Sequence, residues 1–197
     1  MRPEEGVLTS RGRAIGAVLG LLTDELVVVC NGFPSREAYT QGDRPENFYM
    51  IGSMGLASAI GLGVALAQPR RKVVVLDGDG NVLMALGTLA TVGALQPKNF
   101  VHIVFDNEVY GSTGNQPTIS RTVRLEQVAK AAGYKNVERV RELDDAVYEA
   151  KTMLKEDGPS LLLVKVSELA DDVGRVEIEP AAMTERFRKA AMRGTPS

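Results

Sequence analysis

Four near-continuous apolar runs, separated by longer helical patterns, restrict the fold of this 197-residue chain more than any other feature. The runs are LVVVC (26–30), KVVVL (72–76), NFVHIVF (99–105) and SLLLVKV (160–166). A strand that is apolar at nearly every position has to be buried on both faces, which is the situation of a central strand in a parallel sheet covered by helices on either side. The runs therefore predict the centre of a parallel sheet.

Weaker patterns complete a β/α alternation. Two more strands are expected at 48–51 and 136–140, and helices at 9–22, 54–67, 82–95, 125–132, 143–156 and 180–191. Pro69 and Pro97 stand where two of these helices end, and Pro180 is suited to open the last one. The order predicts an α/β fold, a doubly wound and mainly parallel sheet with helices on both faces. One domain is expected over 1–197, with a loose tail at about 192–197.

Composition excludes several classes of protein. The net charge of −2 comes from 23 basic and 25 acidic residues without a basic block, so no nucleic-acid partner is expected. The longest apolar run, 56–67, is too short to span a bilayer, so no membrane is expected either. The single Cys30 cannot form an internal disulfide and the N-terminus lacks a signal-peptide pattern, which favours a cytoplasmic protein. Cys30 itself is typical of a small buried apolar residue.

The stretch VVLDGDGNVL (74–83) places two carboxylates directly after a predicted strand. Asp77, Asp79 and Asn81 alternate as the first ligands of an EF-hand loop do. Such a loop needs Gly at its sixth position and Glu at its twelfth, where this chain has Val82 and Thr88. The sequence therefore excludes an EF-hand calcium loop.

Two polar loops leave the carboxyl ends of predicted parallel strands, where open α/β sheets bind ligands. The first carries Asp79 between Gly78 and Gly80, with a helix expected from about Asn81 whose N-terminus favours an anion such as a phosphate. The second, DNEVYGSTGNQPT (106–118), offers Asn107 and a turn of backbone carbonyls. Carboxylate, amide and carbonyl oxygens are the ligands that Mg²⁺ prefers, so the two loops predict a magnesium ion that clamps a diphosphate.

The spacing of these loops resembles a known signature. Gly78-Asp79-Gly80, 25 further residues and then Asp106-Asn107 resemble the GDG…NN motif of thiamine diphosphate enzymes, and only the first Asn differs. The resemblance implies a Mg²⁺ ion held by Asp79, Asn107 and the backbone carbonyl of Val109, with Asp106 in place of a residue that is not a ligand. It further implies that thiamine diphosphate contacts Gly52, Ser53, Met54, Gly78, Asp79, Gly80, Asn81, Asn107, Val109, Tyr110 and Gly111.

A third segment, IGSMGLASAIGLGVALA (51–67), is similar to the family segment beneath the central bend of the cofactor. The resemblance implies two catalytic contributions. The Gly52 carbonyl would accept a hydrogen bond from the 4′-amino group of the cofactor, and the Met54 side chain would force the cofactor into its bent shape. The alternative is that Met54 is a core methionine and the Gly/Ala run serves close helix packing, which accounts for 57–67 but not for the turn at 52–55.

The resemblance covers nearly the whole chain but only one of the two domains that build such active sites. A pyrimidine-binding partner, an α-type subunit that supplies a glutamate to the cofactor's N1′, is therefore expected, and self-association is expected as well. NGFPSRE, FYMIGSMGLASAIGLG and DNEVYGSTGNQPT resemble segments of sulfopyruvate decarboxylase β subunits and of phosphonopyruvate decarboxylases. The implied reaction is decarboxylation of a 2-oxo acid with an anionic group on C3. Chain length favours 3-sulfopyruvate, which would give sulfoacetaldehyde and CO₂.

Other readings stay open at this level. Arg36 is a candidate for the substrate's anionic group, and a surface ion pair with Glu37 or Asp43 is an equally good explanation of it. His102 fits a packed histidine within a strand better than a catalytic base. The alternatives for the chain as a whole are an acetolactate synthase-like or oxidoreductase-like half-subunit and a non-catalytic cofactor-binding module.

Overall fold

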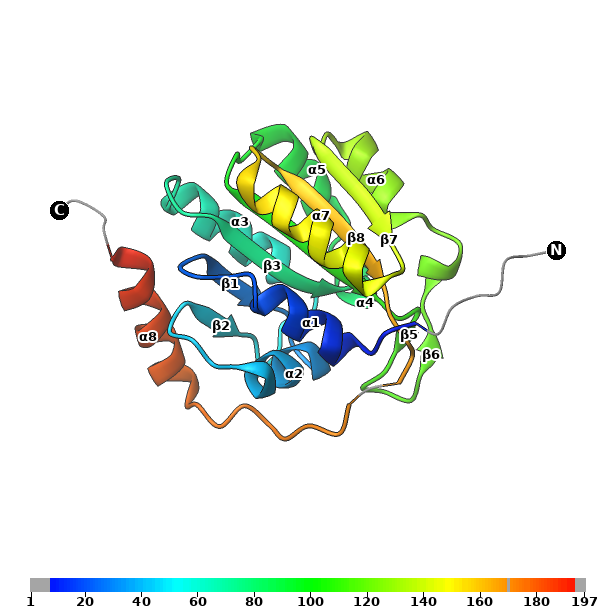
Figure 1. Ribbon diagram of the computed structural model, residues 1–197, viewed down its shortest axis with the longest axis horizontal. Helices are drawn as coiled ribbons and strands as arrows, with labels where there is room; N and C mark the ends of the chain where they lie inside the picture. The colour runs from blue at the N-terminus through cyan, green and yellow to red at the C-terminus, as the bar shows by residue number, and fades with distance from the viewer. Residues whose placement is uncertain (1–7, 170, 194–197) are drawn as a thin grey trace.

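A six-stranded sheet forms the centre of the computed structural model, which describes residues 8–169 and 171–193. All neighbouring strands are parallel (Figure 1). Their order across the sheet is β2 (Asn47–Tyr49), β1 (Leu26–Val29), β3 (Val73–Gly78), β4 (Phe100–Asp106), β8 (Ser160–Lys165) and β7 (Asn136–Val140). The predicted α/β fold is confirmed. Because β3 and β4 are neighbours, the two polar loops leave the same edge of the sheet side by side.

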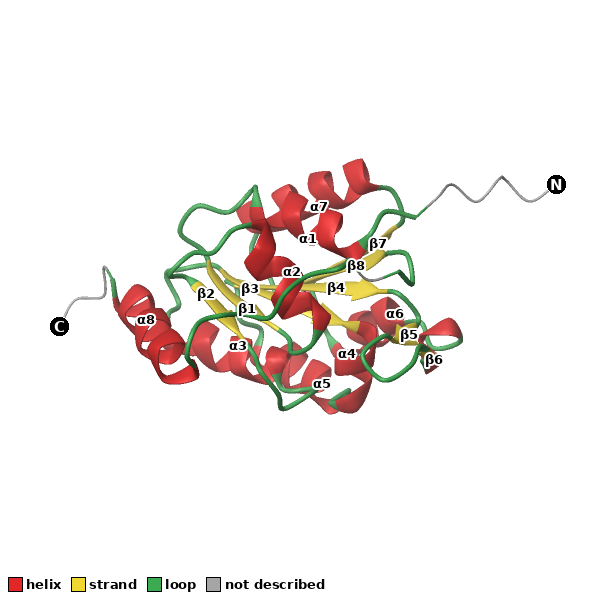
Figure 2. Cartoon of the chain, turned by 90° about the horizontal axis from the view of Figure 1, so that it is seen from below, coloured by secondary structure: helices red, strands yellow, loops and turns green. Residues whose placement is uncertain are grey.

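Helices cover both faces of the sheet (Figure 2). One face is covered by α1 (Arg11–Leu19), α2 (Phe33–Gln41) and α7 (Leu143–Lys155), and the other by α3 (Ala57–Ala67), α5 (Gly87–Leu95) and α6 (Leu125–Ala132). The last helix, α8 (Pro180–Met192), lies along the β2 edge, where the rings of Phe187 and Phe48 are 5.5 Å apart. This edge strand is therefore protected from pairing with another chain.

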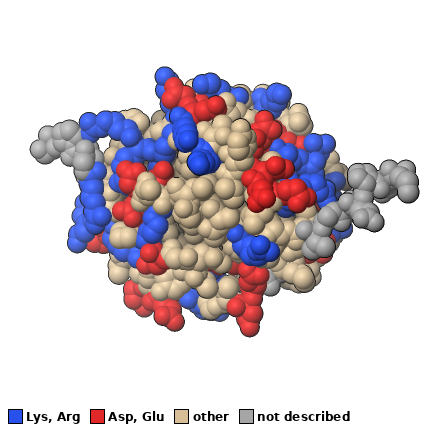
Figure 3. Space-filling view, viewed as in Figure 1, with Lys and Arg blue, Asp and Glu red and all other residues tan. Residues whose placement is uncertain are grey.

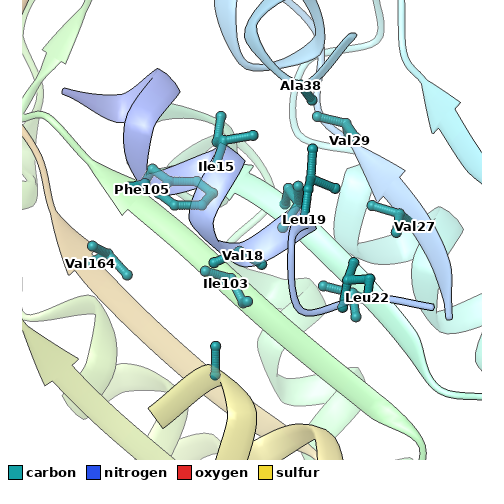
Figure 4. Close-up of a cluster of buried hydrophobic side chains, with 14 of the residues drawn as sticks. Ile15, Val18, Leu19, Leu22, Val27, Val29, Ala38, Ile103, Phe105 and Val164 are labelled. Atoms are coloured by element: carbon teal, nitrogen blue, oxygen red, sulfur yellow. The ribbon is translucent and has the colours of Figure 1, made fainter. Parts of the chain in front are cut away.

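The apolar strands divide their side chains between two cores. Val27 and Val29 point to the α1 face, where Ile15 and Leu19 pack against them (Figure 4), whereas the side chains between them point to the α3 face. Every residue of β1, β4 and β8 is buried. Burial of a large aliphatic side chain contributes on the order of 1.5–3 kcal/mol. The two cores thus fix the register of the strands and, with it, the positions of the loops at their ends.

The helix expected at 82–95 is two helices. α4 (Asp79–Met84) begins at Asp79 rather than near Asn81, and the backbone leaves the helical conformation at Ala85 before α5 begins. The interruption lets the chain pack tightly on the turn at Gly55, since a Cβ atom there would lie 2.9 Å from the Cβ of Met84 and 3.3 Å from that of Ala85. Hydrophobic periodicity continues through such a break, so the pattern alone does not reveal it.

The helix α2 was not expected from the sequence. It is short and rich in polar residues, and its Glu37 points into the protein, where it pairs with Arg11. The loop after β4 also carries a small hairpin, β5 (Val109–Tyr110) and β6 (Gln116–Pro117), followed by a 3₁₀ turn at Ile119–Arg121.

The surface and the ends of the chain agree with the composition. On the face shown in Figure 3, acidic and basic side chains are interspersed and do not gather in one basic patch. Within the part of the chain that the structure describes, no helix combines the length and the apolar character needed to cross a bilayer. The tail was expected from about 192, but α8 continues to Met192, and 194–197 lie outside the described residues.

Candidate functional site

The polar loops at the ends of β3 and β4 meet in one pocket. All but two of the residues predicted to contact the cofactor line it: Met54, Gly78, Asp79, Gly80, Asn81, Asn107, Val109, Tyr110 and Gly111. The other two, Gly52 and Ser53, lie in the adjoining turn and not in the lining. Arg36 lines a neighbouring hollow instead. The expectation that the two loops converge is therefore correct.

The Asn107 amide lies at the centre of this convergence. The amide ends in one oxygen and one nitrogen atom. One of the two lies 2.9 Å from the carbonyl oxygen of Val109, in the loop after β4, and 3.2 Å from Oδ1 of Asp79. The other lies 3.2 Å from Nη1 of Arg11. With nitrogen toward the loop, the amide donates to both oxygens and accepts from Arg11. With oxygen toward the loop, three oxygens converge and two N–H donors stand side by side. That second arrangement is stable when a cation lies among the oxygens and an anion beside the donors.

The Asp79 carboxylate is almost completely buried, at 2% exposure. Its Oδ2 accepts hydrogen bonds from the hydroxyls of Thr118 and Ser120, the latter at 3.0 Å, which leaves Oδ1 facing Asn107. Burial raises the pKa of Asp79 to about 6, and the nearby charge of Asp106 adds to the increase. A cation at Oδ1 would offset this cost, because it favours the ionised carboxylate.

Asp106 supports the loop from below. Its Oδ2 accepts from Nζ of Lys165 at 2.8 Å, and its Oδ1 lies 2.9 Å from the Ser120 hydroxyl oxygen and accepts from the Glu108 backbone N–H at 3.1 Å. The last contact belongs to a tight turn in which Glu108 has a φ of +61°. Beyond this turn, the Val109 carbonyl oxygen lies 2.9 Å from the Asn107 amide. The departure from the family motif at Asp106 is thus matched by a buried lysine.

A second turn, Gly52–Gly55, forms another wall of the pocket. The Gly55 N–H donates to Oδ1 of Asn81 at 2.8 Å, so Asn81 holds this turn on the N-terminal part of α4. A Cβ atom on Gly80 would lie 2.6 Å from the Tyr110 ring and 3.2 Å from the Met54 methyl group. Both side chains therefore rest directly on the backbone of Gly80. The contact explains why glycine is needed there and places Met54 at the pocket rather than in a core.

Sequence reasoning missed several residues of the site. Arg11 reaches the pocket from α1, and its Nε and Nη2 donate to Glu37 at 2.7 and 3.0 Å. Asn31 follows β1, and its buried Oδ1 has no hydrogen-bond partner among the described residues. The strand-end rule applied to β1 would have indicated Asn31. Nothing in the sequence indicates Arg11, because an inward arginine is identified only by its partner.

His102 and Asp77 lie behind the pocket. His102 is fully buried in β4, with Nε2 3.1 Å from Oδ2 of Asp77 and Nδ1 3.3 Å from the Tyr134 hydroxyl. Asp77 therefore points into the sheet while Asp79 points to the pocket, which is incompatible with a common calcium loop. Cys30 is completely buried, and burial raises the pKa of its thiol well above the usual range. Within the described residues, no group of three or more His, Cys, Asp and Glu side chains is arranged to hold a metal.

Comparison with known proteins explains this arrangement. The sequence profile of the thiamine pyrophosphate enzymes, C-terminal TPP-binding domain, matches residues 34–164. The chain belongs to the thiamine pyrophosphate enzymes. The resemblance predicted from the two loops is confirmed at the level of the family, and thiamine diphosphate is the cofactor that the matched domain binds.

Two kinds of relative of this thiamine pyrophosphate enzyme are similar in sequence. The phosphonopyruvate decarboxylase of Streptomyces viridochromogenes is 51% identical over 84% of this chain and 42% of the relative. The sulfopyruvate decarboxylase subunit beta of Methanothermobacter thermautotrophicus is 44% identical over 93% of this chain and 96% of the relative. The chain thus spans less than half of the first relative and nearly all of the second.

The structural comparison supports the same fold. The thiamine diphosphate-dependent 4-hydroxybenzoylformate decarboxylase of Rhodococcus jostii RHA1 superposes with a TM-score of 0.70, covering 85% of this chain and 34% of that protein. The identity is 20%, so this likeness establishes the fold alone.

Proposed function

We propose that this chain is the β-type subunit of a 2-oxo acid decarboxylase that depends on thiamine diphosphate and Mg²⁺. The observation that carries the proposal is the Asn107 amide, which can place three oxygens around a cation and two N–H donors beside an anion. A magnesium ion bound to a diphosphate presents that pair of charges.

The residues have distinct roles in this proposal. Asp79, Asn107 and the Val109 carbonyl hold the Mg²⁺, and the Arg11 and Asn107 N–H groups face the diphosphate. Oxygen ligands at an octahedral ion, completed by phosphate oxygens and water, are what Mg²⁺ prefers. The Oδ1 of Asn31 is a buried acceptor without a partner among the described residues, and this is costly unless a bound group or water donates a hydrogen bond to it.

When bound, thiamine diphosphate supplies the electron sink that decarboxylation of a 2-oxo acid requires. The chain contributes orientation. Met54, resting on Gly80, would support the central bend of the cofactor. The Gly52 carbonyl, in the adjoining turn, would accept a hydrogen bond from its 4′-amino group. Asn81 fixes both by holding the turn through Gly55.

The substrate proposed is 3-sulfopyruvate, with sulfoacetaldehyde and CO₂ as products. The support is architectural: the matched sulfopyruvate decarboxylase β subunit has nearly the same extent as this chain. Phosphonopyruvate is the second candidate, because a phosphonopyruvate decarboxylase is the more similar in sequence, at 51% identity. Both substrates are 2-oxo acids with an anionic group on C3, so the reaction type is common to the two.

A partner subunit is part of the proposal. Large apolar side chains are exposed around the Met54 turn, with Ile51 at 74%, Met84 at 62% and Leu56 at 46% exposure. An exposed apolar group of this kind beside a pocket is typical of an interaction surface. A pyrimidine-binding subunit that covers it would enclose the cofactor and supply the glutamate at N1′. Self-association through the same surface is the alternative occupant.

The test is CO₂ release from 3-sulfopyruvate with Mg²⁺ and thiamine diphosphate, by the chain alone and with a pyrimidine-binding subunit. We expect turnover only from the assembled pair, because the chain alone leaves the cofactor exposed to water. Full activity of the chain alone would refute the two-subunit proposal. Absence of turnover on any 2-oxo acid by the pair would refute the decarboxylase itself.

A further inference from the structure

A second hollow adjoins the candidate cofactor pocket. Its lining is Asn31, Gly32, Ser35, Arg36, Met50, Ile51, Ser112, Arg175 and Val176. Three of these residues, Asn31, Gly32 and Ser112, also line the cofactor pocket. A small molecule that reacts in the first pocket could therefore extend into the second.

Two arginines in this hollow have no charged partner in the part of the chain that the structure describes. Within residues 8–169 and 171–193, neither Arg36 nor Arg175 forms an ion pair or a hydrogen bond. The carboxylates expected to pair with Arg36 are engaged elsewhere. Glu37 accepts from Arg11 at 2.7 Å, and Asp43 accepts from Nη2 of Arg186 at 2.9 Å. The surface ion pair considered for Arg36 is therefore wrong.

The position of Arg36 is fixed relative to the cofactor pocket. Its guanidinium carbon lies 5.4 Å from the ring centroid of Phe33, a ring that lines the cofactor pocket and also faces Arg11 at 5.9 Å. The hydroxyl of the preceding residue, Ser35, donates to the carbonyl of Cys30 at 2.7 Å and lies 3.1 Å from the carbonyl oxygen of Met50. The start of α2 is thereby tied to the ends of β1 and β2.

We propose that Arg36 and Arg175 bind the second anionic group of the substrate and select 2-oxo acids that carry a sulfonate or phosphonate on C3. This inference rests on the proposed decarboxylase function. Guanidinium groups donate paired hydrogen bonds to the oxygens of such groups. No carboxylate stands among the described residues of the hollow, so no negatively charged side chain there opposes an anion. The diphosphate is assigned to the pocket that contains Asp79. The positive charge of Arg36 and Arg175 is therefore free to bind the substrate.

The decisive comparison uses two substrates and the assembled enzyme. We expect Arg36→Gln and Arg175→Gln to lower kcat/KM for 3-sulfopyruvate by about 10- to 100-fold each, as loss of a charge-assisted hydrogen bond predicts. The decrease for pyruvate, which has no group on C3 to bind, should be at least about tenfold smaller. Arg36→Lys keeps the positive charge but loses the planar guanidinium group, so its kcat/KM for 3-sulfopyruvate should lie between those of the wild type and Arg36→Gln. Arg188→Gln, an exposed arginine on α8, is the matched control.

A second measurement separates this inference from the proposed function. Sulfoacetate, which has the anionic group but no 2-oxo group, is titrated into the wild-type and variant complexes by calorimetry. Weaker binding in both arginine variants, with unchanged assembly and unfolding temperature, supports the subsite even if no 2-oxo acid is turned over. Equal losses on pyruvate and sulfopyruvate, or unaltered sulfoacetate binding, would overturn it.

Discussion

The two adjoining pockets differ in whether their charged side chains are paired within the chain. Beneath the pocket at Asp79, the buried Asp106 is neutralised within the chain by Lys165. In the neighbouring hollow, Arg36 and Arg175 have no such partner among the described residues. The difference distinguishes charged residues that hold the structure of a site from charged residues that bind a ligand. Charges paired inside the chain fix its shape and offer a ligand only the atoms that the pair leaves free, such as Nη1 of Arg11, whereas unpaired charges are fully available to a ligand.

The internal pairs do not have to add stability to serve this purpose. Removing two charges from water costs several kcal/mol per ion, and their attraction roughly offsets that cost when the geometry is good. Breaking such a pair is a different matter, because one uncompensated charge stays buried. The Arg11–Glu37 pair, at 6% and 1% exposure, and the Lys165–Asp106 pair therefore specify the positions of α1, α2 and the loop after β4.

The largest effect is expected from Asp79→Ala. Loss of a direct metal ligand should weaken Mg²⁺-dependent binding of thiamine diphosphate by at least about 100-fold, since loss of a residue that only supports a ligand already costs 10–100-fold. The fold should persist, because the two hydroxyls that lose their acceptor, those of Thr118 and Ser120, still contact each other, and Ser120 also contacts Asp106. Calorimetric titration of the assembled enzyme measures the affinity.

The matched control for this prediction is Asp172→Ala, which removes a carboxylate from an exposed position. It should leave cofactor affinity unchanged. Asn107→Ala should behave as Asp79→Ala does. Wild-type affinity in either loop variant would contradict the proposed ligand set.

A smaller effect, on stability, is expected from Lys165→Met. The substitution leaves the Asp106 carboxylate buried and unpaired, which should cost roughly 3–5 kcal/mol in free energy of unfolding. The double variant Lys165→Met with Asp106→Asn should recover most of this loss, because the one carboxylate that still lacks Lys165, that of Glu108, is partly exposed and lies near Arg121. Denaturant unfolding of the four proteins of this cycle gives the coupling. If the effects of the two substitutions on the free energy of unfolding were additive, Lys165 and Asp106 would not be coupled, and the pair would not fix the position of the loop after β4.

The smallest effect is expected from Met54→Ala. The metal and diphosphate contacts remain, but the side chain that rests on Gly80 is lost. Turnover should fall by about tenfold or more, whereas cofactor affinity should change by much less, since only support for the reacting geometry is removed. Steady-state kinetics with a parallel cofactor titration measures both. Wild-type turnover would mean that Met54 serves packing alone.

The fold was predictable because its signals are local. β1, β3, β4 and β8 are apolar at almost every position, and that pattern requires burial on both faces. α6 and β7 were predicted at their observed bounds. The strand-end rule then placed Asp79 and Asn107 in one pocket, because parallel strands end at the same edge of the sheet.

The remaining features depend on contacts between distant segments. α2 escaped prediction because its inward residue is Glu37, whose burial is explained only by Arg11. The interruption between α4 and α5 arises from packing on Gly55, which periodicity does not report. Thr118 and Ser120 were missed as partners of Asp79 for the same reason. Arg175 reaches the Arg36 hollow from a segment with no regular structure, for which no pattern predicts a position.

The most direct test of the central claim is to locate the metal. Crystals of the chain grown with thiamine diphosphate and Mn²⁺ in place of Mg²⁺ allow the ion to be identified by anomalous scattering. We predict one peak within about 2.0–2.3 Å of Oδ1 of Asp79, Oδ1 of Asn107 and the carbonyl oxygen of Val109, with diphosphate oxygens completing the octahedron. A cofactor bound in this pocket with the ion elsewhere, or with the Asn107 nitrogen still facing Asp79, would contradict the account.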